Sequence, residues 1–315
     1  MSVPLAQVIR SGLVEGTHFG SAVVVGSSGE VLWSTGDVTK TFFPRSANKL
    51  MQTLGMVRVG LPLNDQLLAL ACSSHSGEAF HIAGVRQILQ EAECSVSDLQ
   101  CPSDYPLDET QRTELITQGQ PKSSLYMNCS AKHAAMLLAC KTAGWPISNY
   151  CAPDHPLQQT CQAAIEECTG EKVEVVGIDG CGAPVMSSTL VGLARAFGQF
   201  AGPSATADQR MISSAIKLYP EFLAGTWRDV TRLMQGLPGA IAKDGAEGVY
   251  AIGLGDGRAL AIKIADGGER ARIPVAMAIL RDVLGVVSEE VDRQLDSRVT
   301  LGGGQPVGKV IPLIS

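Results

Sequence analysis

The 315-residue chain is poor in charged and aromatic residues, which make up 18% and 5% of it against 45% hydrophobic residues. Such a chain is not disordered, because disorder accompanies low hydrophobicity and high net charge. The formal net charge is −6 and no Lys/Arg-rich run occurs. The sequence therefore predicts no general attraction to nucleic acid or to anionic membranes.

Long uninterrupted apolar segments are missing as well. The longest apolar stretch, around 273–287, contains Arg281 and Asp282 and is too short to cross a bilayer. Residues 1–10 lack the basic and apolar regions of a signal peptide. The nine cysteines are an odd number without a regular spacing, which favours reduced thiols, some of them metal ligands. These features predict a cytoplasmic protein.

The turn and periodicity signals predict one α/β domain of the α+β type over residues 1–315. Strand patterns lie near both chain ends, at 8–10, 21–25, 31–34, 248–254 and 258–264. Helical patterns lie at 46–57, 66–72, 81–92, 130–141, 155–168, 187–200, 207–218 and 273–284. We therefore expect an antiparallel sheet from about 1–60 and 238–315, flanked by helices, and a mainly helical region at about 61–237. Residues 101–120 are expected to be loop, and Gly302-Gly303-Gly304 a flexible break.

The segment Pro44-Arg45-Ser46-Ala47-Asn48-Lys49 stands where a strand-like run changes to a helical pattern. Residues three apart on a helix are neighbours, so the Lys49 amine can lie beside the Ser46 hydroxyl. Serine becomes a nucleophile when a base removes its proton, and a neutral lysine is such a base. Taken alone, however, the motif is far more typical of a serine that caps a helix beside a surface lysine.

A second lysine, in Lys243-Asp244-Gly245, comes immediately before the predicted C-terminal hairpin. A K-T-G element before a late strand accompanies S-x-x-K in β-lactamases and penicillin-binding proteins. Asp244 makes the match loose, and the alternative is a turn with an exposed lysine. A hydroxyl-rich segment, Ser73 to Glu78, offers a third element of such a site, or simply a polar loop before the next helix. A Ser-His-Asp triad with His75 or His133 lacks a G-x-S-x-G elbow.

Two cysteines stand in segments that are typical of ligand sites. Cys129 and His133 are four apart at the start of a predicted helix, and Asp179 and Cys181 lie in a glycine-rich turn. Two thiolates and a nitrogen are a plausible start to a zinc site. Spacing alone nominates His133 as the nitrogen ligand. The alternative is that both cysteines are buried and act as small hydrophobic side chains.

Together these segments resemble the Rhizobium etli-type L-asparaginase II family, also called class 3 asparaginases. The resemblance covers nearly the whole chain. It rests on motifs that occur in order: Arg45-Ser46-x-x-Lys49, Ser73-Ser74-His75-Ser76-Gly77-Glu78, Asn128-Cys129-Ser130-x-Lys132-His133, Asp179-Gly180-Cys181-Gly182-x-Pro184 and Lys243-x-Gly245-x-Glu247-Gly248. It implies a fold like that of serine β-lactamases, penicillin-binding proteins and serine-dependent glutaminases. The implied activity is hydrolysis of L-asparagine to L-aspartate and ammonia.

The resemblance also implies roles for the residues that would carry the reaction. Ser46 and Lys49 match the nucleophile and its paired lysine, and Lys243 matches a second active-site lysine. Ser74 matches the family's second serine, although Ser73 and Ser76 stand beside it.

For the metal, the resemblance implies zinc bound by Cys129, Cys181 and Lys132, which leaves His133 as a neighbour in the pocket. A lysine must lose its proton before it can bind a metal, and its reference pKa is about 10.4. A nearby dication favours this loss.

A zwitterionic substrate needs a cation for its carboxylate and an anion for its ammonium group. Arg45 is the expected cation, and Asp179 or Glu247 the expected anion. We expect a homodimer, since symmetric dimers are the commonest assembly. Two alternatives stay open: a glutaminase or penicillin-recognising serine hydrolase on the same scaffold, and a non-catalytic zinc- or amino-acid-binding protein.

Overall fold

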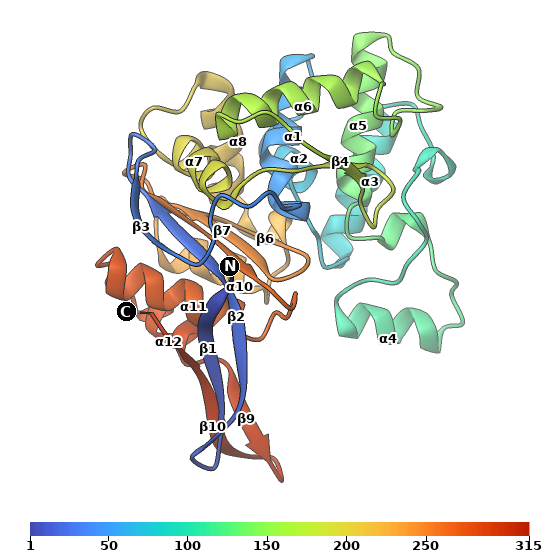
Figure 1. Cartoon of the computed structure of the whole chain (residues 1–315). Coiled ribbons are helices and arrows are strands. Elements are labelled where there is room, and N and C mark those ends of the chain that lie inside the picture. Colours follow the sequence, from blue (N-terminus) through green and yellow to red (C-terminus); the bar gives the residue numbers. More distant parts are fainter. Residues whose placement is uncertain (315) are drawn as a thin grey trace. The chain divides into compact units, whose positions relative to one another are not determined.

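The computed structural model describes residues 1–314, which form two compact units. The first unit combines Met1–Ala47, Ser188–Ser204 and the chain from Arg232 onward, and it contains the large sheet (Figure 1). The second unit combines Asn48–Ser187 with Ala205–Thr231 and is mainly helical. Within the described part, no helix is long and apolar enough to span a membrane.

The sheet of the first unit is antiparallel and draws strands from both chain ends. The strand order is β6-β7-β8-β2-β1-β10-β9, with β3 paired to β2. The strands are β1 (Val3–Arg10), β2 (Leu13–Val25), β3 (Val31–Thr35), β6 (Ile241–Gly245), β7 (Val249–Gly253), β8 (Ala259–Ile264), β9 (Val299–Gly302) and β10 (Gln305–Pro312). In Figure 1 the ribbon of β1, β2, β9 and β10 extends beyond the other strands. The expected α/β fold, with an antiparallel sheet from both ends, is confirmed.

Helices cover both faces of this sheet. Helix α7 (Leu190–Ala201) packs on β2, β7 and β8, while α11 (Arg272–Ala278) contacts β1, β7, β8 and β10 (Figure 1). Helix α11 continues as a π-helical turn, η4 (Ile279–Val283), and α12 (Glu289–Leu295) follows. Strands β6 and β7 are buried at every residue. Gly253 permits this packing, because any Cβ there would collide with the carbonyl oxygen of Phe197.

Three local features differ from the expectation. The Lys243 motif precedes the predicted β7–β8 hairpin, as expected, but it is itself a strand, β6, with Lys243 opposite Ala251 of β7. The turn comes later, at Glu247 and Gly248, which both have positive φ angles. Gly303 and Gly304 form no flexible break but the turn between β9 and β10, also at positive φ. The third difference lies within the expected loop of residues 101–120, where Glu109–Thr117 form helix α4. Because α4 buries none of its residues, its sequence has no apolar periodicity that would indicate a helix.

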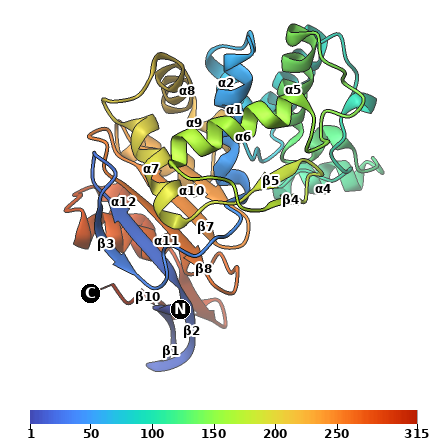
Figure 2. The same ribbon diagram turned by 45° about the horizontal axis from the view of Figure 1, so that its top comes forward.

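The second unit is built around α5 (Ser130–Ala143), which is buried from Ser130 to Cys140. Contacts join α5 to α1 (Lys49–Arg58), α2 (Asp65–Ala71), α3 (Ala79–Glu91) and α6 (Pro156–Thr169). The other elements are η2 (Val96–Asp98), η3 (Ser124–Tyr126), β4 (Val176–Ile178), β5 (Pro184–Met186), α8 (Ala207–Leu218) and α9 (Pro220–Leu223). Figure 2 shows the β4–β5 hairpin beside α6. Helix α10 (Asp229–Gly236) and the turn η1 (Arg45–Asn48) complete the chain.

Candidate active site

Ser46 lies in the 3-10 turn η1, which runs directly into α1, so the backbone is helical from Ser46 to Arg58. The expected Ser46–Lys49 spacing of about one helical turn is therefore present. Arg45, immediately before Ser46, has a φ of 56°. This left-handed conformation is strained for a residue with a side chain, and such strain is concentrated at functional sites.

The end of β6 lies against the segment that carries Ser46. A Cβ on Gly245 would collide with the carbonyl oxygen of Pro44, so only glycine allows this approach. The same Pro44 oxygen accepts a hydrogen bond from the N–H of Ala47 at 3.2 Å. The first unit thus brings the Lys243-x-Gly245 strand next to the turn of Ser46.

Lys243 is completely buried and has a carboxylate partner. Its Nζ donates to the carbonyl oxygen of Asp244 at 2.9 Å and to Oδ1 of the same residue at 2.7 Å. Oδ2 of Asp244 is 3.8 Å from Nη1 of Arg272, whose guanidinium stands over the ring of Tyr250 at 5.3 Å. The adjacent carboxylate favours the ammonium form of Lys243.

Lys49 is 1% exposed and differs from Lys243 in its partners. Its Nζ donates to the carbonyl oxygen of Ser73 and, at 3.0 Å, to the hydroxyl oxygen of Ser74. Among residues 1–314, no carboxylate lies within ion-pair distance of it. Of the neighbouring hydroxyls, Ser76 instead donates to the carbonyl of Ala224 at 2.9 Å. The structure therefore brings Lys49 and Ser74 together and leaves Lys49 without a counter-ion.

A cluster of two thiols and an amine lies in the same unit. Nζ of Lys132, at the first turn of α5, is 3.2 Å from Sγ of Cys181. A hydrogen bond from the Cys129 thiol, together with the nearby Lys132 ammonium, holds the pKa of Cys181 far below its ordinary value, although burial opposes this. Burial lowers the pKa of Lys132, but the two neighbouring sulfurs raise it by more. These two pKa directions favour a thiolate on Cys181 beside an ammonium group on Lys132.

His133 stands beside this cluster and interacts with Cys181. Its Nδ1 is 2.8 Å from the hydroxyl of Tyr150, whereas its buried Nε2 makes no hydrogen bond of ordinary geometry among residues 1–314. Burial lowers the pKa of His133, which keeps the imidazole neutral and able to bind a metal. Two sulfurs with a lysine or imidazole nitrogen fit the donor preferences of zinc. In the described part of the chain, no three His, Cys, Asp or Glu side chains form such a group by themselves, which favours Lys132 over His133 as the nitrogen ligand.

The expected substrate-binding residues are divided between the units. Arg45 and Glu247 belong to the first unit, where Glu247 forms the β6–β7 turn with a φ of 63°. Asp179 belongs to the second, where its N–H bonds to the carbonyl of Ala183 at 2.9 Å in the turn that presents Cys181. Its charge contributes to the raised pKa of Lys132.

Sequence reasoning missed the partners of Lys243. Asp244 entered only as a mismatch within a motif, and Arg272 was not considered, although it is a rare charge at the start of an apolar helix. That isolated arginine was a usable signal, because a fully buried guanidinium requires an anion.

Comparison with known proteins gives one match that covers nearly the whole chain. The model of the L-asparaginase II family matches residues 6–312. No curated protein matches the chain.

Solved structures give distant likenesses. They include a beta-lactamase (Mb2281c) from Mycobacterium bovis, with a TM-score of 0.45, 17% identity and coverage of 84% of this chain and 94% of that one. The native form of Mglu has a TM-score of 0.46 at 12% identity, covering 96% and 74%. EstCE1, a hydrolase with promiscuous acyltransferase activity, has a TM-score of 0.46 at 10% identity, covering 88% and 93%. These likenesses are too distant to assign an activity.

The family match, in contrast, spans the Ser46, Lys49, Cys129, Cys181 and Lys243 motifs, and the chain belongs to the L-asparaginase II family of amide-hydrolysing enzymes.

Proposed function

We propose that the protein hydrolyses the side-chain amide of L-asparagine through an acyl-enzyme on Ser46. The observation that carries this proposal is the state of Lys49: it is buried, lies one helical turn after Ser46, and contacts Ser74 without any carboxylate partner. The other buried lysine, Lys243, is ion-paired with Asp244, which makes it the poorer candidate for the base that activates Ser46.

In the first step, Lys49 takes the hydroxyl proton of Ser46, directly or through Ser74, and the serine oxygen attacks the carboxamide carbon. The C–N bond then breaks, and the nitrogen leaves as ammonia with the proton returned by the lysine. Water, deprotonated by the same lysine, attacks the resulting β-aspartyl ester and releases L-aspartate and free Ser46. Lysine thus serves as base and acid in turn.

Lys243 supports this step as a fixed cation. Its ammonium group is held by Asp244, so its proposed role is that of a fixed positive charge in the reaction. Backbone N–H groups at the turn of Ser46 and along β6 are the proposed donors to the oxyanion, since preorganised N–H groups stabilise the developing charge. Arg45 is the proposed partner of the substrate carboxylate, with Asp179 or Glu247 for its ammonium group.

The proposed zinc ion is bound by Cys129 and Cys181 with a nitrogen from Lys132, or from His133 in its place. Bound zinc would supply a fixed positive charge that orders the surrounding pocket. The donors are already gathered, because Lys132 contacts Cys181 and the pKa of Cys181 favours the thiolate. The zinc ion, a homodimeric assembly and a cytoplasmic location stay predictions.

The decisive assay for the activity is an ammonia-release panel with L-asparagine, L-glutamine and β-aspartyl amides, with and without added Zn²⁺, together with a chromogenic β-lactam. We expect turnover of L-asparagine to exceed that of every other compound. Faster turnover of glutamine would instead indicate a glutaminase, and faster turnover of the β-lactam a penicillin-recognising serine hydrolase. Binding of an amino acid without ammonia release from any amide would make the protein a binding protein.

Asp244→Asn is expected to lower kcat by about tenfold, because it keeps the shape of the side chain and removes the counter-ion of Lys243. Loss of an adjacent anion lowers a lysine's pKa, so the ammonium form is lost at a lower pH. The alkaline limb of the pH profile of kcat/KM should therefore move to lower pH.

The control for this experiment is Glu269→Gln, which removes an exposed carboxylate 3.6 Å from the same Arg272. It should retain the wild-type profile. An Asp244→Asn protein with wild-type activity at every pH would show that Lys243 needs no fixed counter-ion.

Cys181→Ser is expected to weaken zinc binding by roughly 10²-fold or more, because a thiolate ligand is lost. Titration with Co²⁺, followed by the thiolate-to-metal absorption, measures this without any activity assay. Wild-type affinity should rise with pH, since the ammonium of Lys132 must lose its proton before its nitrogen binds a metal.

Two further variants, Lys132→Met and His133→Ala, identify the nitrogen ligand. The variant that removes this ligand should lose metal affinity as Cys181→Ser does. The half-buried Cys94→Ser is the matched thiol control and should bind metal normally. Unchanged Co²⁺ absorption in Cys181→Ser would contradict the proposed site.

A further inference from the structure

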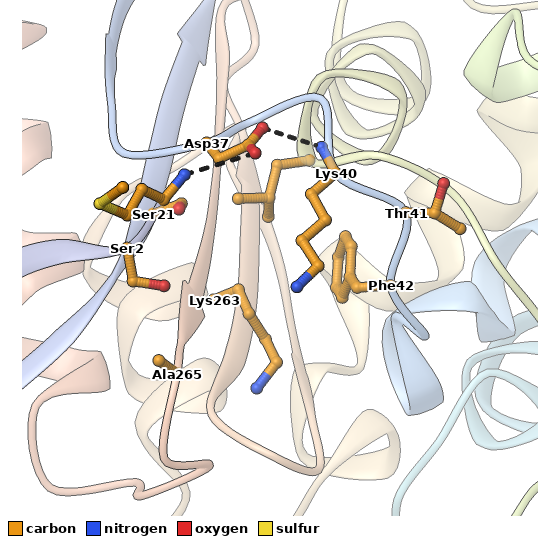
Figure 3. Close-up of a pocket in the computed structure, with 10 residues that line it drawn as sticks. Ser2, Ser21, Asp37, Lys40, Thr41, Phe42, Lys263 and Ala265 are labelled. Carbon is orange, nitrogen blue, oxygen red and sulfur yellow. Dashed lines mark hydrogen bonds and ion pairs between the residues drawn. The ribbon is translucent and has the colours of Figure 1, made fainter.

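A separate pocket of about 290 Å³ opens on the first unit, and none of its residues has a role in the proposed reaction. Strand β2, the loop after β3, the start of α7 and the end of β8 line it, and Figure 3 shows the side chains that face it. This volume lies at the lower limit of small-molecule sites, so the pocket suits a ligand of only a few heavy atoms.

Lys263 supplies the first cation of this pocket. Its Nζ donates to the carbonyl oxygens of Glu247 at 2.5 Å and Ile264 at 2.7 Å. An ammonium group has three donors, so one N–H is left over. The side chain is half-buried, and burial lowers the pKa of Lys263 although the charges of Glu247 and Asp266 oppose this. Neither carboxylate, nor any other within residues 1–314, is close enough to form an ion pair with Lys263. A partly desolvated cation without a paired carboxylate favours an anion beside it.

The second cation, Lys40, also lacks an anionic partner in the described part of the chain, while the pocket's carboxylate is already engaged. Asp37 Oδ1 accepts from the N–H groups of Thr39 at 3.3 Å and Lys40 at 3.2 Å, and its Oδ2 is 3.4 Å from the amino group of Met1. Figure 3 shows the ammonium groups of Lys40 and Lys263 pointing away from Asp37. The residues that line the pocket therefore carry more positive than negative charge.

The remaining wall is apolar apart from one hydroxyl. Phe42 and Leu190 provide an aromatic and an aliphatic surface, and Leu190 is fully buried beneath the pocket. Ser21 is almost buried, and its hydroxyl bonds to no other described residue. A donor, two cations and an apolar wall within one small cavity are the usual composition of a site for an organic anion.

We propose that this pocket binds a small organic anion. Its anionic group lies between Lys40 and Lys263 and accepts a hydrogen bond from Ser21, and its short apolar part contacts Phe42 and Leu190. A carboxylate and a phosphate monoester share this chemistry, and the experiment below distinguishes them.

The test is isothermal titration of the full chain, at constant ionic strength, with benzoate, phenyl phosphate, acetate and benzyl alcohol. Constant ionic strength matters because salt screens partly exposed charges. Benzoate or phenyl phosphate should bind at least tenfold more tightly than both acetate, which lacks the ring, and neutral benzyl alcohol. Whichever of the two aromatic anions binds better identifies the anionic group.

Lys40→Met should weaken that binding several-fold, and Lys40→Met/Lys263→Met should abolish it. Lys40 is exposed and forms no ion pair, so Lys40→Met should leave the fold intact. This single variant therefore tests the proposal even if the change at Lys263 disturbs the fold. Lys122→Met removes an exposed lysine of the other unit and should change nothing. Unchanged affinity in Lys40→Met, benzyl alcohol binding as tightly as benzoate, or no binding of either aromatic anion at about 10 mM would overturn the proposal.

Discussion

Ser46→Ala is expected to lower kcat/KM for L-asparagine by roughly 10³-fold or more, with the fold intact. The substitution removes only the oxygen that would form the acyl-enzyme. Ser46 is half-exposed at the start of a helical segment, so the loss of its hydroxyl should cost at most about 1–2 kcal/mol of stability as a helix-end effect. The measurement is steady-state ammonia release, with the melting temperature as a check on folding.

Ser34→Ala provides the matched control, because Ser34 is an exposed hydroxyl on β3 of the same unit. It should retain wild-type activity. The comparison with Ser74→Ala is equally informative. If Ser74 only relays the proton, its loss should reduce kcat less than the loss of Ser46. An active Ser46→Ala protein together with an inactive Ser74→Ala protein would show that Ser74, and not Ser46, is the nucleophile.

Lys49→Ala is expected to lower kcat by about 10²–10⁴-fold, the usual contribution of a positioned base. The change removes the amine that contacts Ser74 and leaves a buried space beside it. A small primary amine such as ethylamine should enter this space and restore part of the activity. Rescue should increase with pH, because only the neutral amine accepts a proton.

Rescue distinguishes a base from a structural lysine. Lys243→Ala should not be rescued in the same manner, since its ammonium group is held by Asp244 and acts as a fixed charge. Lys141→Ala, an exposed lysine at the end of α5, controls for general effects of the added amine. If ethylamine rescued Lys243→Ala and left Lys49→Ala inactive, Lys243 would be the base.

Local patterns predicted the elements that follow from short-range chemistry. The helix after Ser46 and the β7–β8 hairpin around Gly255-Asp256-Gly257 follow from spacing and turn residues over a few positions. The strand β6 was not predicted, because its burial depends on α7 and on β7, and a strand buried on both sides has no alternating pattern. Strand β10 was missed for a related reason: it pairs with β1 at the opposite end of the chain.

The same distinction applies to the candidate site. The motifs identified Lys49, Cys129 and Lys243, because each motif is continuous in sequence. The contacts that give these residues their properties join distant positions, such as Lys49 with Ser74 and Lys132 with Cys181. Periodicity carries no information about such pairs. The ion pair of Asp244 with Arg272 is the clearest example, since Asp244 is the variable position of its motif and Arg272 belongs to no motif.

The covalent step on Ser46 has one direct measurement. The enzyme is mixed with saturating L-asparagine, quenched in acid within the first turnover, and examined by intact-protein and peptide mass spectrometry. The proposed mechanism predicts a mass increase of one aspartyl group, located on the peptide that contains Ser46 and absent from Ser46→Ala. Full turnover of L-asparagine without any adduct, or an adduct on Ser74, would contradict Ser46 as the nucleophile.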